Sequence, residues 1–92
     1  MIVQYKSHPV VILSFILFGD NSQADPFIYE MIVRRYPKNI FAVYIRNVVE
    51  KNVAVTQGLL ASIEQSGIHT CLFVDNEEAM QHSQRIGLIA PQ

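Results

Sequence analysis

The chain alternates between continuously apolar segments and segments whose apolar residues recur at helical spacing. Val10 to Phe18 is apolar almost without interruption and rich in β-branched and aromatic residues, which is typical of a strand covered on both faces in a parallel sheet. Ile40 to Val48 and Ile68 to Val74 have a similar composition, so they predict a second and a third strand.

A helix is predicted after the first of these strands. Asp25 is an expected N-cap, and Pro26 takes the first helical position, where the missing N–H of proline costs nothing. Pro37 ends the helix. Four apolar residues at helical spacing are expected to face the sheet: Phe27, Ile28, Met31 and Ile32.

Two further helices follow the second and third strands. The first of them ends before Gly67, a predicted C-cap, and the last begins at a cap formed by Asp75 and Asn76 and closes near Gly87. The apolar stripe before Gly67 consists of Val55, Leu59, Leu60 and Ile63.

The resulting order, β-α-β-α-β-α, predicts an α/β fold with a three-stranded parallel sheet and flanking helices. Residues 1–92 are expected to form a single domain or part of one, and residues 1–9 have no assigned structure. In such sheets the functional groups gather beyond the carboxyl ends of the strands. We therefore look for chemistry at residues 19–25, 46–51 and 75–76.

Composition and charge narrow the classes of function. Half of the residues are hydrophobic and the net charge is −1, which favours a globular chain and gives no electrostatic footprint for nucleic acid. Cys71 is the single cysteine, so neither a disulfide framework nor a Cys-His zinc site is expected. A reducing, cytoplasmic setting is the expectation that follows.

The N-terminal segment has an alternative interpretation. Lys6, the apolar run from Val10 and the small residues around Ser22 also resemble a secretory signal peptide. We favour a buried strand, because the run ends abruptly at Gly19 and the pattern after Asp25 continues in one fold. No apolar run reaches the roughly 18 to 20 residues that a membrane-spanning helix needs.

Candidate chemistry lies in the loop after the first strand. Asp20 and Asp25 stand at its two ends, and Mg²⁺ takes hard oxygen ligands, of which one or two are protein carboxylates. Gly19 favours a tight turn and close approach to a ligand. On spacing alone, Asp25 as a cap and Asp20 as a turn residue is the more common arrangement.

The surrounding residues carry a more specific signal. The segment Phe15 to Val48 contains Gly19-Asp-Asn-Ser-Gln-Ala-Asp-Pro26, then Tyr36-Pro37 and Tyr44-Ile-Arg46. It closely resembles the actin-patch-protein type of phosphatidate phosphatase, a family of the haloacid dehalogenase superfamily. A weaker likeness continues through Gly67, the strand from Cys71 to Asp75, and Gly87 to Ile89.

This resemblance implies a function for the loop. In that family the Gly-Asp loop is the superfamily's fourth motif, whose carboxylates hold Mg²⁺, and here the motif falls on Asp20 and Asp25. Asp20 matches the position expected to coordinate directly; Asp25 would ligate directly, ligate through water or cap the helix. Ser22 stands where glycine is more usual. Asn47 after Arg46 replaces an aspartate, which weakens any third acidic ligand.

The resemblance also implies what this chain lacks. The family's nucleophile and acid/base are aspartates of an upstream Asp-x-Asp-x-Thr motif, whereas this chain has aspartate only at positions 20, 25 and 75. Lys6 lies too close to the loop to match the family's upstream lysine. The chain is therefore expected to be the C-terminal part of a haloacid dehalogenase-like Rossmannoid domain that acts on a phosphorylated lipid or another phosphomonoester. It should be inactive alone.

The alternative function is a non-catalytic α/β interaction module. An unpaired strand from Val10 to Phe18 would promote self-association or pairing with a missing N-terminal part of the domain. Arg34 and Arg35 could contact anionic lipid, although two charges near a helix end are usually solvated.

The remaining reactive side chains give no further site. Three histidines lie far apart in the pattern, and none stands beside a serine or cysteine in a nucleophilic motif: His8, His69 and His82. Cys71 is expected to be a buried hydrophobe.

Overall fold

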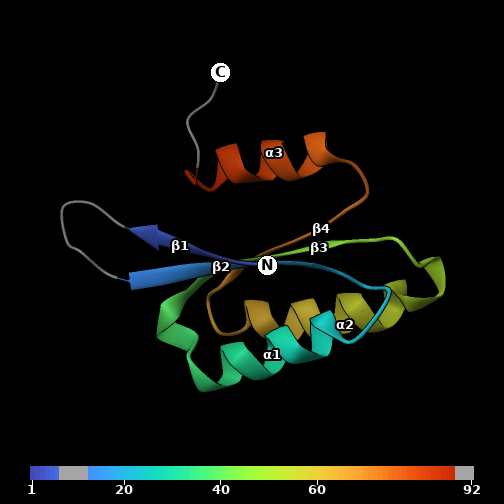
Figure 1. Ribbon diagram of the computed structural model, residues 1–92, viewed down its shortest axis with the longest axis horizontal. Helices are drawn as coiled ribbons and strands as arrows, with labels where there is room; N and C mark the ends of the chain where they lie inside the picture. The colour runs from blue at the N-terminus through green and yellow to red at the C-terminus, as the bar shows by residue number, and fades with distance from the viewer. Residues whose placement is uncertain (7–12, 89–92) are drawn as a thin grey trace.

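The computed structural model describes residues 1–6 and 13–88. The chain forms four strands and three α-helices, with a short 3₁₀ turn before β3 and another before α2 (Figure 1). The strands are β1 (Ile2–Lys6), β2 (Leu13–Asp20), β3 (Ile40–Arg46) and β4 (His69–Phe73). The helices are α1 (Asp25–Arg35), α2 (Val53–Glu64) and α3 (Asn76–Arg85).

The sheet is mixed, in the order β1-β2-β3-β4. The predicted α/β class and the parallel pairing of the three later strands are confirmed, but the prediction of three strands is wrong. Residues left unassigned form β1, which pairs antiparallel with β2 from Ile2↔Leu17 to Lys6↔Leu13. An antiparallel neighbour needs only a short connection. Ile2 and Val3 remain exposed at this edge. Gln4 and Lys6 interrupt the apolar residues of β1, so the strand has no continuous apolar pattern.

The first predicted strand lies inside the sheet. Its residues 13–18 belong to β2, which continues to Asp20 and is flanked by β1 on one side and β3 on the other. Residues 10–12 of the predicted strand lie outside the described part of the chain. The expectation that this strand is an unpaired edge is therefore wrong for its described residues, because β1 covers that side of it. Self-association of the chain stays a prediction.

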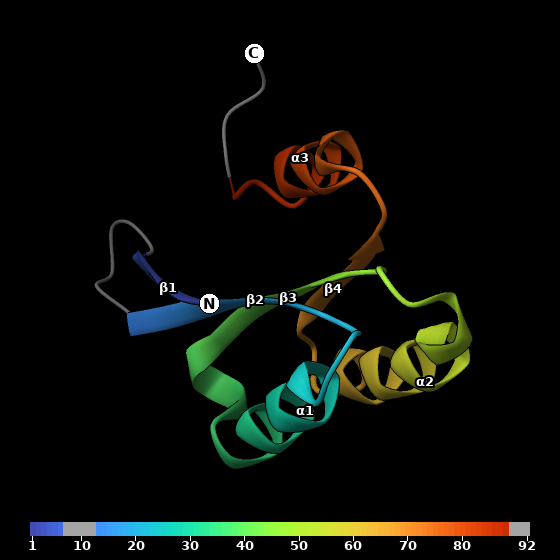
Figure 2. The same cartoon turned by 45° about the vertical axis from the view of Figure 1, so that its right-hand side comes forward.

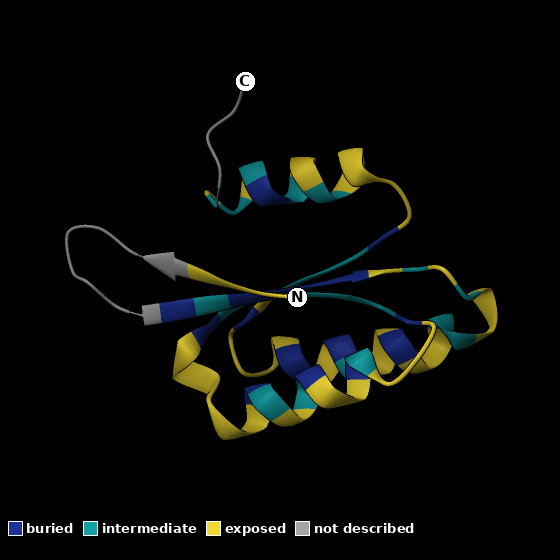
Figure 3. Cartoon of the chain, in the orientation of Figure 1, coloured by how far each residue is buried: buried dark blue, intermediate teal, exposed yellow. Residues whose placement is uncertain are grey.

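Helices cover both faces of the sheet. α1 and α2 pack side by side on one face, and α3 lies on the other (Figures 1 and 2). The larger core cluster sits between the sheet and the α1–α2 layer and includes Leu17, Val43 and Ile45, all fully buried (Figure 3). Burial of each such side chain contributes about 1.5–3 kcal/mol. Within the described residues, no helix is long and apolar enough to cross a bilayer.

The buried face of α1 differs from the predicted stripe. Pro26, Tyr29 and Val33 face the sheet, whereas Phe27, Ile28 and Met31 of the predicted stripe are exposed; only its fourth member, Ile32, packs against the core. Two sets of apolar residues at helical spacing lie on different sides of this helix. The point at which α1 leaves the β2 loop decides which set meets the sheet.

The second and third helices follow the prediction more closely. Leu60 and Ile63 of α2 are buried, although Val55 is exposed. Asp75 caps α3: its carboxylate accepts a hydrogen bond from the Glu78 N–H, and the Glu78 side chain accepts one from the Asp75 N–H. Gly67, after α2, has a φ of +81°, a backbone conformation that favours glycine at a helix end.

A buried polar network attaches α3 to the sheet. The hydroxyl of Tyr44, a fully buried β3 residue, forms 2.8 Å hydrogen bonds with His82 Nδ1 and Ser83 Oγ. Ser83 Oγ also donates to the Ala79 carbonyl. Burial, followed by the nearby Arg85, holds the pKa of His82 below its ordinary value. This network joins the centre of the sheet to the final helix.

We predict that Tyr44→Phe lowers the free energy of unfolding by about 1–2 kcal/mol, because it leaves His82 and Ser83 without their shared partner. Urea denaturation of the chain measures this loss. Tyr36→Phe is the matched control, since Tyr36 is half exposed and its hydroxyl accepts a hydrogen bond from the neighbouring Arg35. Equal stability of Tyr44→Phe and wild type would contradict a role of the network in holding α3.

We also predict that stability falls on mild acidification. Because the pKa of His82 is depressed in the folded chain, the unfolded chain binds the proton more readily. The contribution of neutral His82 to the free energy of unfolding is complete above the ordinary histidine pKa of 6.5. This contribution is lost as the pH falls from 6.5 toward the lower pKa of His82 in the folded chain. Unfolding free energies measured across this window should decrease less steeply for His82→Gln than for wild type. A His69→Gln control that flattened the slope equally would reject the assignment to His82.

Candidate functional site

The predicted site lies at one edge of the sheet, as expected for parallel strands. Asp20 ends β2 and pairs in register with Arg46, the last residue of β3, which pairs in turn with Phe73 at the end of β4. Asp75 follows two residues later, but its carboxylate is occupied by the cap of α3. The candidate carboxylates of this edge are therefore those of the β2–α1 loop.

Asp20 is held in an ionised state by its own loop. Its Oδ1 accepts hydrogen bonds from the Ser22 N–H at 2.8 Å and the Ser22 hydroxyl at 2.5 Å. The hydroxyl bond, then the backbone bond, lower the pKa of Asp20; Arg46 lowers it further, while desolvation opposes them. Ser22 thus orients the carboxylate and favours its charged form.

Asp25 is positioned differently from the prediction. The N-cap of α1 is Ala24, whose carbonyl accepts the first helical hydrogen bond from Ile28 at 3.0 Å, and Asp25 is the first helical residue. The interpretation of Asp25 as the cap is therefore wrong. Its Oδ2 instead accepts a hydrogen bond from the Asp20 N–H at 3.3 Å. The helix start turns this carboxylate back toward the end of β2.

Gly19 makes room for that arrangement. A Cβ at position 19 would lie 2.7 Å from Asp25 Oδ2 and 2.8 Å from Tyr29 Cε2, too close for any unshifted contact. Gly19 lies within β2 and forms no turn, so its role is close approach by the helix that follows, rather than the tight turn predicted from the sequence. A side chain here would push α1 and its carboxylate away from β2.

Tyr29 connects the core to the two carboxylates. Its hydroxyl donates to the Phe18 carbonyl at 2.5 Å, and its ring packs in the core of the α1–α2 layer. Burial raises the pKa of Tyr29, and the charges of Asp25 and Asp20 raise it further.

Asn21 is a structural residue of the site that sequence reasoning missed. Its side chain is 1% exposed. Its Oδ1 accepts from the N–H groups of Val48 and Val49, and its Nδ2 donates to Asn47 Oδ1 at 2.8 Å. This amide ties the β2 loop to the β3 loop. The sequence offered one signal, a polar residue close after a buried strand. That signal alone does not distinguish a metal ligand from a residue that holds two loops together by hydrogen bonds.

Asn47 has a similar structural role. Besides accepting from Asn21, it donates through Nδ2 to Glu50 at 3.2 Å. Among the described residues, no group of three or more His, Cys, Asp or Glu side chains is placed to hold a metal ion.

The other residues considered from the sequence lie elsewhere. The backbone of Lys6 pairs with Leu13, at the opposite end of β2 from Asp20. His69 and His82 belong to β4 and α3, and His8 lies outside the described residues. Cys71 is partly buried, and burial raises the pKa of its thiol.

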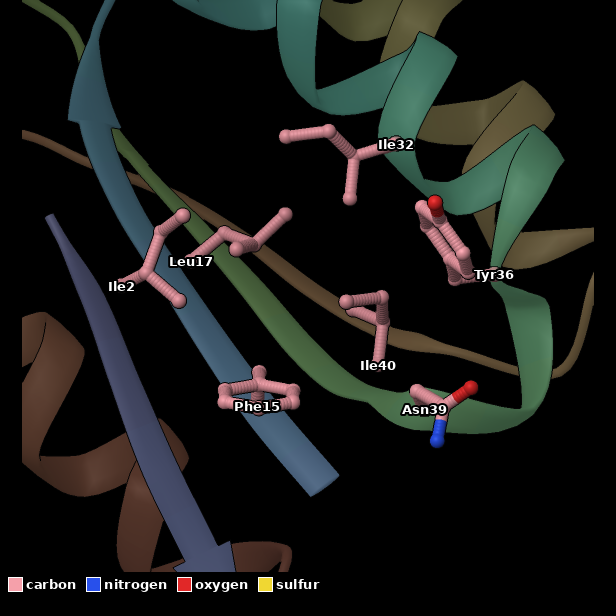
Figure 4. A pocket seen from close by; sticks show the side chains of 7 residues that line it. All are labelled: Ile2, Phe15, Leu17, Ile32, Tyr36, Asn39 and Ile40. Carbon is pink, nitrogen blue, oxygen red and sulfur yellow. The ribbon is translucent and has the colours of Figure 1, made fainter. Parts of the chain in front are cut away.

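An apolar cavity of about 300 Å³ has neither Asp20 nor Asp25 among its lining residues. It opens near the start of β3, between the β1–β2 hairpin and the end of α1, and Figure 4 shows its lining side chains: Ile2, Phe15, Leu17, Ile32, Tyr36, Asn39 and Ile40. The cavity has no acidic or basic lining residue, so it offers no group to phosphoryl chemistry.

Comparison with known proteins gives a family match over part of the chain. The model of the family described as phosphatidate phosphatase APP1, catalytic domain, matches residues 7–47, which is less than half of the chain. No curated protein sequence matches. No solved structure matches either.

The matched segment contains the site described above. Beyond residues 7–12, which the structure does not describe, it runs through β2, the loop with Asp20 and Asp25, α1 and β3 as far as Asn47. The resemblance predicted from the sequence is confirmed over this segment. Residues 7–47 are a partial match to the catalytic-domain family of phosphatidate phosphatase APP1.

Proposed function

We propose that this chain supplies the Mg²⁺-binding loop of a haloacid dehalogenase-like, Rossmannoid phosphatase domain in the cytoplasm that hydrolyses phosphatidate or a related phosphomonoester. Asp20 and Asp25 are the proposed metal ligands. The family match over residues 7–47 supports the reaction class. Phosphatidate is proposed as the substrate from the name of that family.

One observation carries the metal assignment. The Asp25 carboxylate accepts a hydrogen bond from the Asp20 N–H, so the first turn of α1 returns one carboxylate to the residue that carries the other. Mg²⁺ is usually held by one or two protein carboxylates, with water and substrate phosphate completing its octahedron. Two aspartates at the end of a buried strand fit that donor set.

The loop prepares Asp20 for this role. Both bonds from Ser22 fall on Oδ1, and within the described residues Oδ2 accepts no hydrogen bond. These two bonds lower the pKa of Asp20 and so favour its charged form. Asn21 fixes the loop against the end of β3. When bound, Mg²⁺ would offset the negative charge of a phosphoryl group.

The nucleophile must come from outside the residues present here. Aspartate occurs only at positions 20, 25 and 75, and Asp75 serves the cap of α3. A phosphatase of this class attacks phosphorus with an aspartate and then releases phosphate by hydrolysis of the acyl phosphate. We therefore propose that an Asp-x-Asp-x-Thr segment joins this sheet in the complete domain.

For the metal ligands, we predict that Mg²⁺ titration of the chain shifts the backbone NMR signals of residues 19–25. Asp20→Asn should abolish these shifts, because asparagine removes the charge while its Oδ1 still accepts from Ser22. Asp75→Asn is the matched control: asparagine caps helices as well as aspartate does, so binding should be retained. Unchanged titration of Asp20→Asn would refute the assignment.

We further predict that the purified 92-residue chain releases no phosphate from phosphatidate, with or without Mg²⁺, because it contains no free aspartate pair for nucleophile and acid/base. A phosphate-release assay on mixed micelles checks this. Metal-dependent release that Asp20→Asn abolishes would show that the chain is a complete catalyst and would overturn the proposal of a separate nucleophile segment.

A further inference from the structure

The side of α1 that faces away from the sheet carries both apolar and cationic side chains. Phe27, Ile28 and Met31 are 52%, 47% and 68% exposed. Positions 31, 34 and 35 lie four, seven and eight residues after position 27. In a helix with 3.6 residues per turn, these four positions share one face. We refer to Phe27, Ile28, Met31, Arg34 and Arg35 as the outer α1 face.

The apolar and charged parts of this face are separated along the helix. The three apolar residues lie in the first two turns, while Arg34 and Arg35 lie in the last turn and Lys38 follows in the next segment. Figure 3 shows the exposed outer side of α1, on the opposite side of the molecule from α3. Glu30 pairs with Arg34, which leaves a net positive charge at the end of the helix.

Arg35 and Tyr36 form an aromatic and cationic pair beside this face. The guanidinium carbon of Arg35 lies 5.6 Å from the centre of the Tyr36 ring, and its Nε donates to the Tyr36 hydroxyl at 3.0 Å. The neighbouring surface forms an open hollow of about 380 Å³ lined by Glu30, Met31, Arg34 and Arg35. The cations therefore border the most exposed apolar side chain of the helix.

We propose that the outer α1 face docks on an anionic phospholipid surface. Apolar side chains of an interfacial helix enter the boundary between headgroups and acyl chains, while the basic residues meet the anionic headgroups. Arginine and lysine suit this position, because their aliphatic stems lie along apolar material while the charge stays in water. The combination favours a lipid surface over a second copy of the chain, whose like charges would repel.

Docking in this way has a consequence for the proposed site. Phe27 lies two residues after Asp25, so contact of the outer α1 face with lipid brings the loop of Asp20 and Asp25 next to the headgroups. That consequence rests on the proposed function. The docking itself rests only on the surface of α1 and requires neither Mg²⁺ nor catalysis.

The test is co-flotation of the 92-residue chain with phosphatidylcholine vesicles, with and without phosphatidylserine, in EDTA. Phosphatidylserine is not a phosphomonoester and EDTA removes Mg²⁺, so the proposed metal site is not involved. We expect binding to the anionic vesicles that salt weakens. Met31→Glu should lower partitioning about tenfold or more, and Arg35→Gln about fivefold.

Matched controls come from α3 on the opposite side of the sheet. Met80 is 47% exposed and Arg85 is exposed, so Met80→Glu and Arg85→Gln repeat the same chemical changes away from the proposed face. Both should bind like wild type, and far-ultraviolet circular dichroism confirms folding of all four variants. Absence of binding to anionic vesicles, or equal losses for the α1 and α3 variants, would overturn the proposal. So would a salt-resistant dimer that Met31→Glu dissociates while vesicle binding stays unchanged.

Discussion

The parallel pairing of β2 with β3 is the constraint on which the rest of this structure depends. It places Asp20 opposite Arg46, so the loops after both strands leave the sheet at the same edge. The buried amide of Asn21 then joins these loops by accepting from two N–H groups of the β3 loop and donating to Asn47. A buried amide is costly unless it is fully bonded, and here each bond also holds the edge in register. The loop between the two candidate carboxylates is therefore held to the β3 loop by the hydrogen bonds of Asn21.

The hydrophobic core and the candidate site share side chains. Tyr29 packs among the core residues, and its hydroxyl bonds to the backbone of β2 just before Gly19. Because Gly19 has no side chain, Tyr29 and Asp25 can approach the strand closely. The distance between α1 and β2 thus sets both the packing of the core and the position of the Asp25 carboxylate. Packing at this edge and the placement of Asp25 therefore depend on the same contacts, whereas the charge of Asp20 is favoured separately by Ser22 and Arg46.

The two sides of α1 have different surroundings. The inward side, with Pro26, Tyr29 and Val33, attaches it to the sheet, and the outward side presents apolar residues followed by arginines. A helix of a small α/β chain does not need exposed phenylalanine, isoleucine and methionine for its own stability, since burial is what makes such residues stabilising. The proposed docking on an anionic lipid surface would account for this exposed set.

The sequence by itself determined the order of elements from β2 to α3, the cap at Asp75, and the presence of two aspartates at the end of a buried strand. These features depend on local patterns: continuous apolar runs, cap residues and glycines. Only the tertiary structure decided three others. β1 pairs through backbone hydrogen bonds at an edge and leaves little apolar pattern; the buried side of α1 depends on where the helix leaves the β2 loop. Asp25 turns toward Asp20 because Gly19 admits it, a contact between separate elements that no local pattern encodes.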